Sequence, residues 1–159
     1  MTSQFASLPF GLGDVLVLEN GEEAWLAGAL VCAESAPIAF LFRAPSGGQD
    51  RAVYLRAVPP VDAYWLDDCS GARAHGPLEP PTSLEHAGEI YTRARRLPVA
   101  ISRTGEVSFD LEGTGILAEY RGPADRRLVR VAPREAVLVC AGRVLLPGAY
   151  DRFPGGAKE

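Results

Sequence analysis

The fold is decided by two stretches that follow the same plan, IAFLFRAPSGGQDRAVYLRAV at residues 38–58 and ILAEYRGPADRRLVRV at residues 116–131. Each has two apolar runs separated by a turn rich in Gly, Pro or Asp, which is the pattern of a β-hairpin. The corresponding residues are Ile38 and Ile116, Phe42 and Tyr120, Arg43 and Arg121, Pro45 and Pro123, and Val53 and Leu128. The correspondence predicts one β unit written twice.

Strand patterns continue on both sides of these hairpins. VDAYWLDD at 61–68 is a short strand-like run, and VSFDLE at 107–112 alternates apolar and polar residues as a half-buried strand does. The run AWLAGALVCAESAPIAFLF at 24–42 is almost long enough to span a membrane, but Glu34 and Pro37 lie near its centre. We therefore expect strands on either side of a turn there, the first of them AWLAGALVCA, and no transmembrane helix.

The sequence predicts a mainly β protein in which two related antiparallel halves pack into one compact unit. Each half would be a small sheet or half-barrel that is too small to be stable alone. The expected divisions are residues 1–68 for the first β half, 69–87 for a Pro/Gly-rich connector, 88–150 for the second β half and 151–159 for a flexible tail.

Composition indicates a soluble globular chain. The 159 residues are 47% hydrophobic and 23% charged, and the N-terminus lacks the basic and apolar regions of a signal peptide. The three cysteines form no CxxC motif, and Cys32 and Cys140 lie in apolar runs, as buried free thiols do. We expect a reducing, cytoplasmic setting, which includes the periphery of the inner membrane.

Charge is unevenly distributed, and the formal net charge of −4 argues against a nucleic-acid partner. Arginine supplies 15 of the 16 basic residues, and most of the arginines lie in the second half. Arginine can grip carboxylate or phosphate with two hydrogen bonds, so an arginine-rich sheet face is a candidate binding surface. Strand alternation places Arg93 and Arg95 on one face with Tyr91. The candidate binding residues are Arg93, Arg95, Arg96, Arg126, Arg127 and Arg130.

Metal-binding and catalytic residue types gather only between Asp67 and His86. Cys69, His75 and His86 are weak metal candidates, because their spacing matches no familiar zinc motif. No nucleophile elbow, phosphate-binding loop or dinucleotide fingerprint is present. We therefore predict a protein that is not an enzyme and needs no cofactor.

Two resemblances bear on function. The segment RARRLPVAIS followed by DLEGTG is similar to the cyclic-di-GMP-binding PilZ signature, although Glu112 stands where that signature has serine. Over residues 10–155 the chain resembles an uncharacterised bacterial β-domain family, through GLGDVLVLENGEEAWLAGAL, PPTSLEHAGEIYT, AEYR and REAVLVCAGRVLLPGAYDRFPG. Genes of that family tend to lie beside phage-shock-protein-A-like, polyamine-synthase-like and ion-channel-like genes.

The second resemblance implies an accessory module in an envelope-stress-type system that binds a protein or membrane-surface partner, such as a membrane-associated stress protein. One alternative is a sensor that holds a nucleotide or a polyamine between the two halves. Another is a metal-dependent hydrolase that uses Asp67, Asp68 and the histidines.

Overall fold

The computed structural model describes residues 8–45, 51–58, 61–69, 74–75, 79–105, 112–133 and 136–154. Strands dominate this part of the chain, so the prediction of a mainly β protein is confirmed. The strands are β1 (Val15–Leu18), β2 (Glu23–Trp25), β3 (Gly28–Ala33), β4 (Pro37–Arg43), β5 (Ala52–Arg56), β6 (Asp62–Asp68), β7 (Ala74–His75), β8 (Ser83–His86), β9 (Glu89–Gly105), β10 (Gly113–Arg121), β11 (Arg126–Pro133), β12 (Ala136–Val144) and β13 (Tyr150–Phe153). Two 3₁₀ turns, η1 (Pro123–Asp125) and η2 (Pro147–Ala149), precede β11 and β13.

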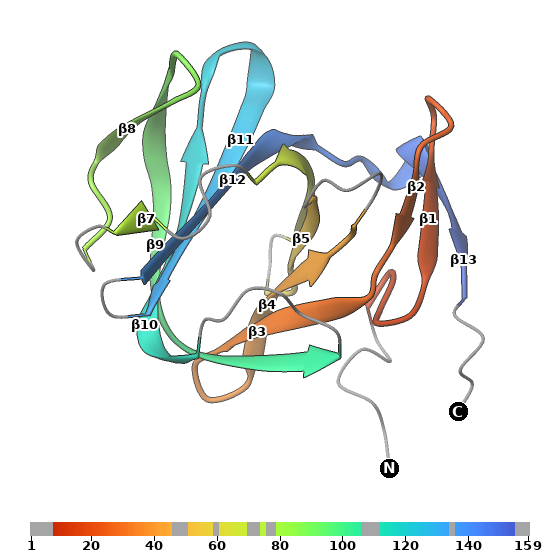
Figure 1. The fold of residues 1–159 in the computed structure, drawn as a ribbon, viewed down its shortest axis with the longest axis horizontal. Helices are drawn as coiled ribbons and strands as arrows, with labels where there is room; N and C mark the ends of the chain where they lie inside the picture. Colours follow the sequence, from red (N-terminus) through yellow and green to blue (C-terminus); the bar gives the residue numbers. More distant parts are fainter. Residues whose placement is uncertain are drawn as a thin grey trace.

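Eight of these strands form a closed antiparallel barrel (Figure 1). Their order is β10-β11-β12-β6-β5-β4-β3-β9, and pairing of β10 with β9 closes the ring. The sequence had suggested two small sheets or half-barrels, and the strands of both stretches lie in one continuous ring. Strands β3–β6 supply one run of four neighbours and β9–β12 the other.

Strand β9 holds the ring together. Its first residues pair with β8, its middle from Thr92 to Ile101 pairs with β10, and its end from Ala100 to Gly105 pairs with β3. A strand of 17 residues can serve three neighbours because β8 and β3 pair with its two ends while β10 pairs with the stretch between them, and the pairings overlap only at Thr92, Ala100 and Ile101.

A smaller sheet of order β13-β1-β2 lies beside the barrel (Figure 1). It shares an apolar layer with the outer faces of β3–β6, in which Leu16, Phe40, Phe42 and Trp65 are buried. The barrel interior is a second apolar layer, built on inward-facing residues such as Leu41, Leu66, Val99, Leu117 and Val129. A third, around Tyr91 and Tyr120, covers the outer faces of β9–β12.

Several boundaries differ from the sequence prediction. Residues 24–33 form two strands, β2 and β3, instead of one. The interval 69–87, predicted to be a connector, contains β7 and β8, and residues 151–153 of the predicted tail belong to β13, which pairs with β1. The predicted strand at 107–112 lies outside the described residues except for Glu112. No helix in the described part of the chain has the length and apolar character to cross a bilayer.

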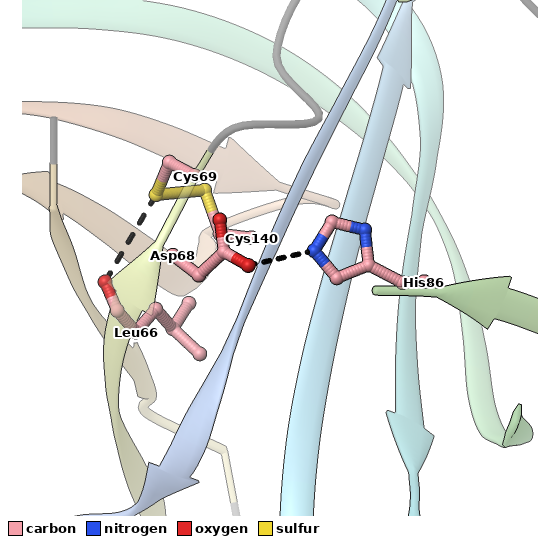
Figure 2. Close-up of a disulfide and its surroundings, with 5 residues drawn as sticks. All are labelled: Leu66, Asp68, Cys69, His86 and Cys140. Carbon is pink, nitrogen blue, oxygen red and sulfur yellow. Dashed lines mark hydrogen bonds and ion pairs between the residues drawn. A yellow bond between two sulfur atoms is a disulfide. The ribbon is translucent and has the colours of Figure 1, made fainter. Parts of the chain in front are cut away.

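Cysteine pairing corrects a second prediction. Cys140 was expected to be a free thiol and is joined to Cys69 by a disulfide that links the end of β6 to β12 (Figure 2). Cys32 is buried and free, as expected, and burial raises the pKa of its thiol to about 12. The sequence could not pair Cys69 with Cys140 because they are 71 positions apart.

We predict that the disulfide contributes about 4 kcal/mol to the free energy of unfolding, because it closes a long loop in the unfolded chain. The double variant Cys69→Ala/Cys140→Ala should melt well below the wild type, and a reductant should lower the melting temperature of the wild type alone. A wild-type melting temperature that is insensitive to reductant would contradict the link.

Gly142 lies where the pairing of β12 with β6 shifts register. A Cβ at this position would overlap the carbonyl oxygen of Trp65, whereas a Cβ at Gly148 would meet open space. Gly142→Ala should therefore lower the free energy of unfolding by about 2 kcal/mol or more. Gly148→Ala is the matched control and should change it little. Chemical denaturation of both variants checks the prediction, and equal effects would refute it.

Candidate functional site

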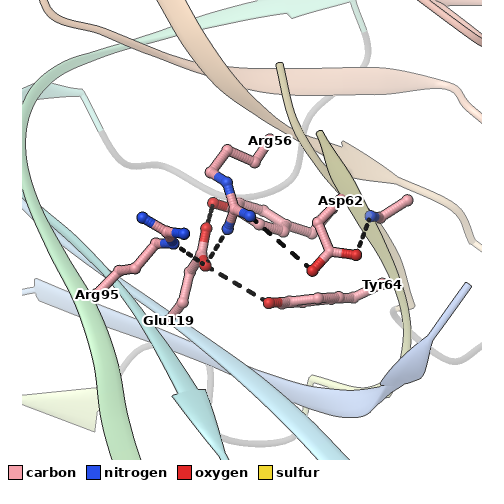
Figure 3. A network of polar contacts seen from close by, with 7 residues as sticks. Arg56, Asp62, Tyr64, Arg95 and Glu119 are labelled. Atoms are coloured by element: carbon pink, nitrogen blue, oxygen red, sulfur yellow. Dashed lines mark hydrogen bonds and ion pairs between the residues drawn. The ribbon is translucent and has the colours of Figure 1, made fainter. Parts of the chain in front are cut away.

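Polar side chains gather at one end of the barrel interior, which we call the polar mouth. Arg56 is the last residue of β5, Asp62 is the first of β6, and Arg127 is the second of β11, so all three lie at the same end of the barrel. The remaining members are contributed by β5, β6, β9 and β10 (Figure 3). The polar mouth comprises Tyr54, Arg56, Asp62, Tyr64, Arg95, Glu119 and Arg127.

Glu119 is the centre of the polar mouth. Its side chain is 2% exposed, and its carboxylate accepts hydrogen bonds from the Tyr54 hydroxyl and from Arg56. The Tyr64 hydroxyl and the Nε of Arg95 each lie 3.5 Å from Oε1 (Figure 3). A buried carboxylate is costly unless it is paired and hydrogen-bonded, and these donors supply both.

Burial and the charge of Glu119 together keep its neighbours protonated. Burial, followed by the negative charge of Glu119, raises the pKa of Tyr64 to about 12 and holds the pKa of Tyr54 well above its usual range. Burial opposes the charge on Arg56, but the hydrogen bond and the attraction from Glu119 outweigh it and raise its pKa. At neutral pH both tyrosines are therefore hydrogen-bond donors and Arg56 is a cation.

A β-bulge brings Arg95 into this group. Glu119 pairs with Arg95 but the next residue, Tyr120, pairs with Arg93, so Ala94 is an extra residue in β9. Arg95 consequently points into the barrel, whereas Arg93 points outward. The prediction that Arg93 and Arg95 share a face is wrong, because strict alternation ends at the bulge.

Arg127 belongs to the polar mouth but not to the Glu119 cluster. Its guanidinium lies over the ring of Tyr64, 5.8 Å from the ring centroid. Its NH1 donates to the carbonyl oxygens of Asp125 and Arg126 at 3.1 and 3.3 Å. Its Nε is buried and has no acceptor within the described part of the chain.

The other predicted arginines lie on the outside of the wall formed by β9–β11. Arg96 binds Glu79 with two hydrogen bonds, of 2.5 and 2.7 Å, and Arg93 donates to the carbonyl oxygen of Pro80. The Nε of Arg126 donates to the hydroxyl of Tyr91 at 3.1 Å. These contacts fasten residues 79–81 to the barrel and cover the apolar layer around Tyr91.

Arg130 also faces this outer layer and is only 3% exposed. Burial lowers the pKa of its guanidinium, although Tyr120 and Glu79 oppose that change. The six predicted arginines therefore do not form one surface: Arg95 and Arg127 line the polar mouth, and the other four lie outside the barrel.

The described side chains among the weak metal candidates are engaged in other contacts. Cys69 is bound to Cys140, so its thiolate is not available as a ligand, and the Nε2 of His86 lies 3.1 Å from Asp68 (Figure 2). The side chain of His75 lies outside the described residues. Within the described part of the chain, no three His, Cys, Asp or Glu side chains are arranged to hold a metal ion.

The sequence did not predict five members of the polar mouth, which are Tyr54, Arg56, Asp62, Tyr64 and Glu119. Glu119 offered one signal, a carboxylate inside the apolar run ILAEY, where a solvent-facing residue was equally plausible. Its hydrogen-bond donors are 55 to 65 positions away in the chain, so no local pattern could have assigned them.

Comparison with known protein families, curated proteins and solved structures finds no match to this chain. The polar mouth is consequently interpreted from its own chemistry.

We predict that Glu119→Gln lowers the free energy of unfolding by about 3 kcal/mol, because it leaves the buried Arg56 without its closest counter-charge. Glu112→Gln is the matched control: this carboxylate is half exposed and lies 3.5 Å from Arg103, so its loss should cost about 0.5 kcal/mol or less. Urea denaturation of both variants measures the two changes in the free energy of unfolding. Similar small changes would show that the Glu119 cluster contributes little to stability.

Proposed function

We propose that the protein is a non-catalytic binding module that engages an anionic partner through the arginine-bearing end of the barrel. The observation that carries the proposal is the excess of guanidinium groups there. Arg56, Arg95 and Arg127 share the polar mouth with only two carboxylates, those of Asp62 and Glu119. A site with excess positive charge attracts anions and disfavours cations.

The rim of the polar mouth adds another cation. Arg121 pairs with Arg127 across β10 and β11, so the two residues occupy the same face of the sheet. Arg121 is exposed, and the side chain of Arg95 is 41% exposed. Both are therefore accessible to a partner, whereas Arg93 and Arg96 are committed to Pro80 and Glu79.

The partner class that fits best is an acidic protein surface. The net charge of −4 argues against nucleic acid. An accessory role in a bacterial envelope-stress system agrees with the family resemblance and is part of the proposal. A location in the cytoplasm or at the inner face of the membrane is proposed with it, although the Cys69–Cys140 disulfide is a bond that a reducing compartment disfavours. An anionic membrane surface would offer similar charge and is an outcome that the test below separates.

A small ligand is the second candidate, and the polar mouth favours an anionic one over a polyamine. Two of the acidic residues of the first half that could hold a polyamine are already engaged. Glu22 binds Arg51 and Asn20, and Asp68 contacts His86.

We also infer that the barrel arose from two related four-stranded units, β3–β6 and β9–β12. The first strands of the two units pair with each other, as do the last strands, which is the arrangement that a two-fold axis produces. Two corresponding pairs support this inference. Phe42 and Tyr120 are both buried in outer apolar layers, and so are Val53 and Leu128.

The binding proposal predicts that neutralising the rim weakens partner capture without unfolding the barrel. The test variant is Arg95→Gln/Arg121→Gln. The matched control is Arg103→Gln, which removes a similarly exposed charge further along β9. Crosslinked pull-down from native cells, read by mass spectrometry, should yield one dominant acidic protein that the wild type and the control retain and the test variant loses.

A partner retained equally by all three proteins would refute the surface assignment. Co-sedimentation with anionic vesicles, compared with zwitterionic vesicles, tests whether the partner is a membrane surface. Binding to anionic vesicles in place of an acidic protein would reassign the partner to the membrane.

A further inference from the structure

We propose that the polar mouth contains a specific site for a small oxyanion, a carboxylate or phosphate group, with Arg127 as its principal ligand. This inference rests on the proposed function, because it names the chemical group that the arginine-bearing end would recognise.

The side chain of Arg127 is held in place by its neighbours. Its guanidinium is held on two sides, by the ring of Tyr64 and by the carbonyl oxygens of Asp125 and Arg126 that accept from NH1. The turn that presents the Asp125 carbonyl is itself costly, since Ala124 and Asp125 both have positive φ angles, of 55° and 60°. The side chain is therefore fixed before any ligand binds, which lowers the entropic cost of binding.

The Nε–H of Arg127 is a buried donor with no acceptor among the described residues. A buried donor that lacks an acceptor costs about 1–3 kcal/mol. Glu119 does not satisfy it, because its carboxylate already serves Tyr54 and Arg56, with Tyr64 and Arg95 nearby. An oxygen of an external anion would supply the missing acceptor.

Two further arginines lie near Arg127. Arg121 is its cross-strand neighbour, and Arg95 extends from β9 on the far side of β10. Arg121 also lines a shallow surface depression of about 610 Å³ between the β8–β9 and β10–β11 turns, together with Thr92, Pro123 and one carboxylate, that of Glu89. A ligand whose anionic group reaches Arg127 could place its remaining atoms in this depression.

These contacts divide the residues of the polar mouth into two groups with different roles. Glu119 neutralises Arg56 and orients the two tyrosines, so this inner group is a scaffold. Arg95, Arg121 and Arg127 form the outer group that faces the ligand. A polyamine would meet three guanidinium groups there, which excludes it on charge.

The test uses the full chain and two probes, inorganic phosphate and acetate, each titrated against chloride at constant ionic strength. The readouts are the melting temperature and the ¹⁵N-detected Nε–H resonance of Arg127, assigned by its disappearance in Arg127→Lys. We expect a saturable shift of that resonance and a rise in melting temperature. Arg127→Lys keeps the charge but loses the forked donor geometry, so affinity should fall about tenfold.

Arg121→Gln, an exposed substitution that should not disturb folding, should weaken binding less, and Arg103→Gln should leave it unchanged. Tighter binding of phosphate than of acetate would assign a phosphate-bearing ligand, and the reverse order would assign a carboxylate. The absence of saturable binding of either probe, or equal binding by Arg127→Lys, would overturn the inference.

The two proposals fail separately. If phosphate and acetate do not bind but the acidic partner is still captured through Arg95 and Arg121, only the oxyanion site is wrong. If a probe binds at Arg127 but no acidic protein or anionic vesicle is retained, the macromolecular function is wrong and the protein is a small-ligand sensor.

Discussion

The pairing of β9 with both β10 and β3 is the constraint on which the rest of the structure depends. These two ladders close the barrel, and closure removes the unpaired strand edges that an open eight-stranded sheet would expose. Closure also separates an inside from an outside. Leu117 and Glu119 can then be buried in the interior, while Tyr120 is buried on the opposite face, where its hydroxyl donates to the carbonyl oxygen of Pro81.

Enclosure explains why the polar mouth is chemically distinct from the outer arginines. Outside the wall, Arg96 and Glu79 form a solvated pair. The hydrogen bond that Arg96 donates lowers the pKa of Glu79. Such pairs contribute little to stability. Inside, Arg56 and Glu119 are almost fully buried, so each depends on the other, and removing one partner is costly. The same residue types therefore have different roles on the two faces.

The bulge at Ala94 places Arg95 in the polar mouth. Without it, Arg95 would follow Arg93 to the outer face and the polar mouth would lose its most exposed cation. Bulges are common where a strand must redirect one side chain next to a functional site. Arg127, fixed by backbone carbonyls and by Tyr64, then completes a set of arginines at the rim.

The sequence by itself determined the strand content and the two hairpins. Alternation and turn composition are local properties, so they predicted β4 with β5 and β10 with β11 correctly. Only the tertiary structure decided barrel closure, the Cys69–Cys140 link and the burial of Glu119. The disulfide, the ladder between β3 and β9 and the contact of Glu119 with Tyr54 each join residues more than 60 positions apart. The inward direction of Arg95 depends on one extra residue in a strand, and neither kind of feature leaves a periodic signal.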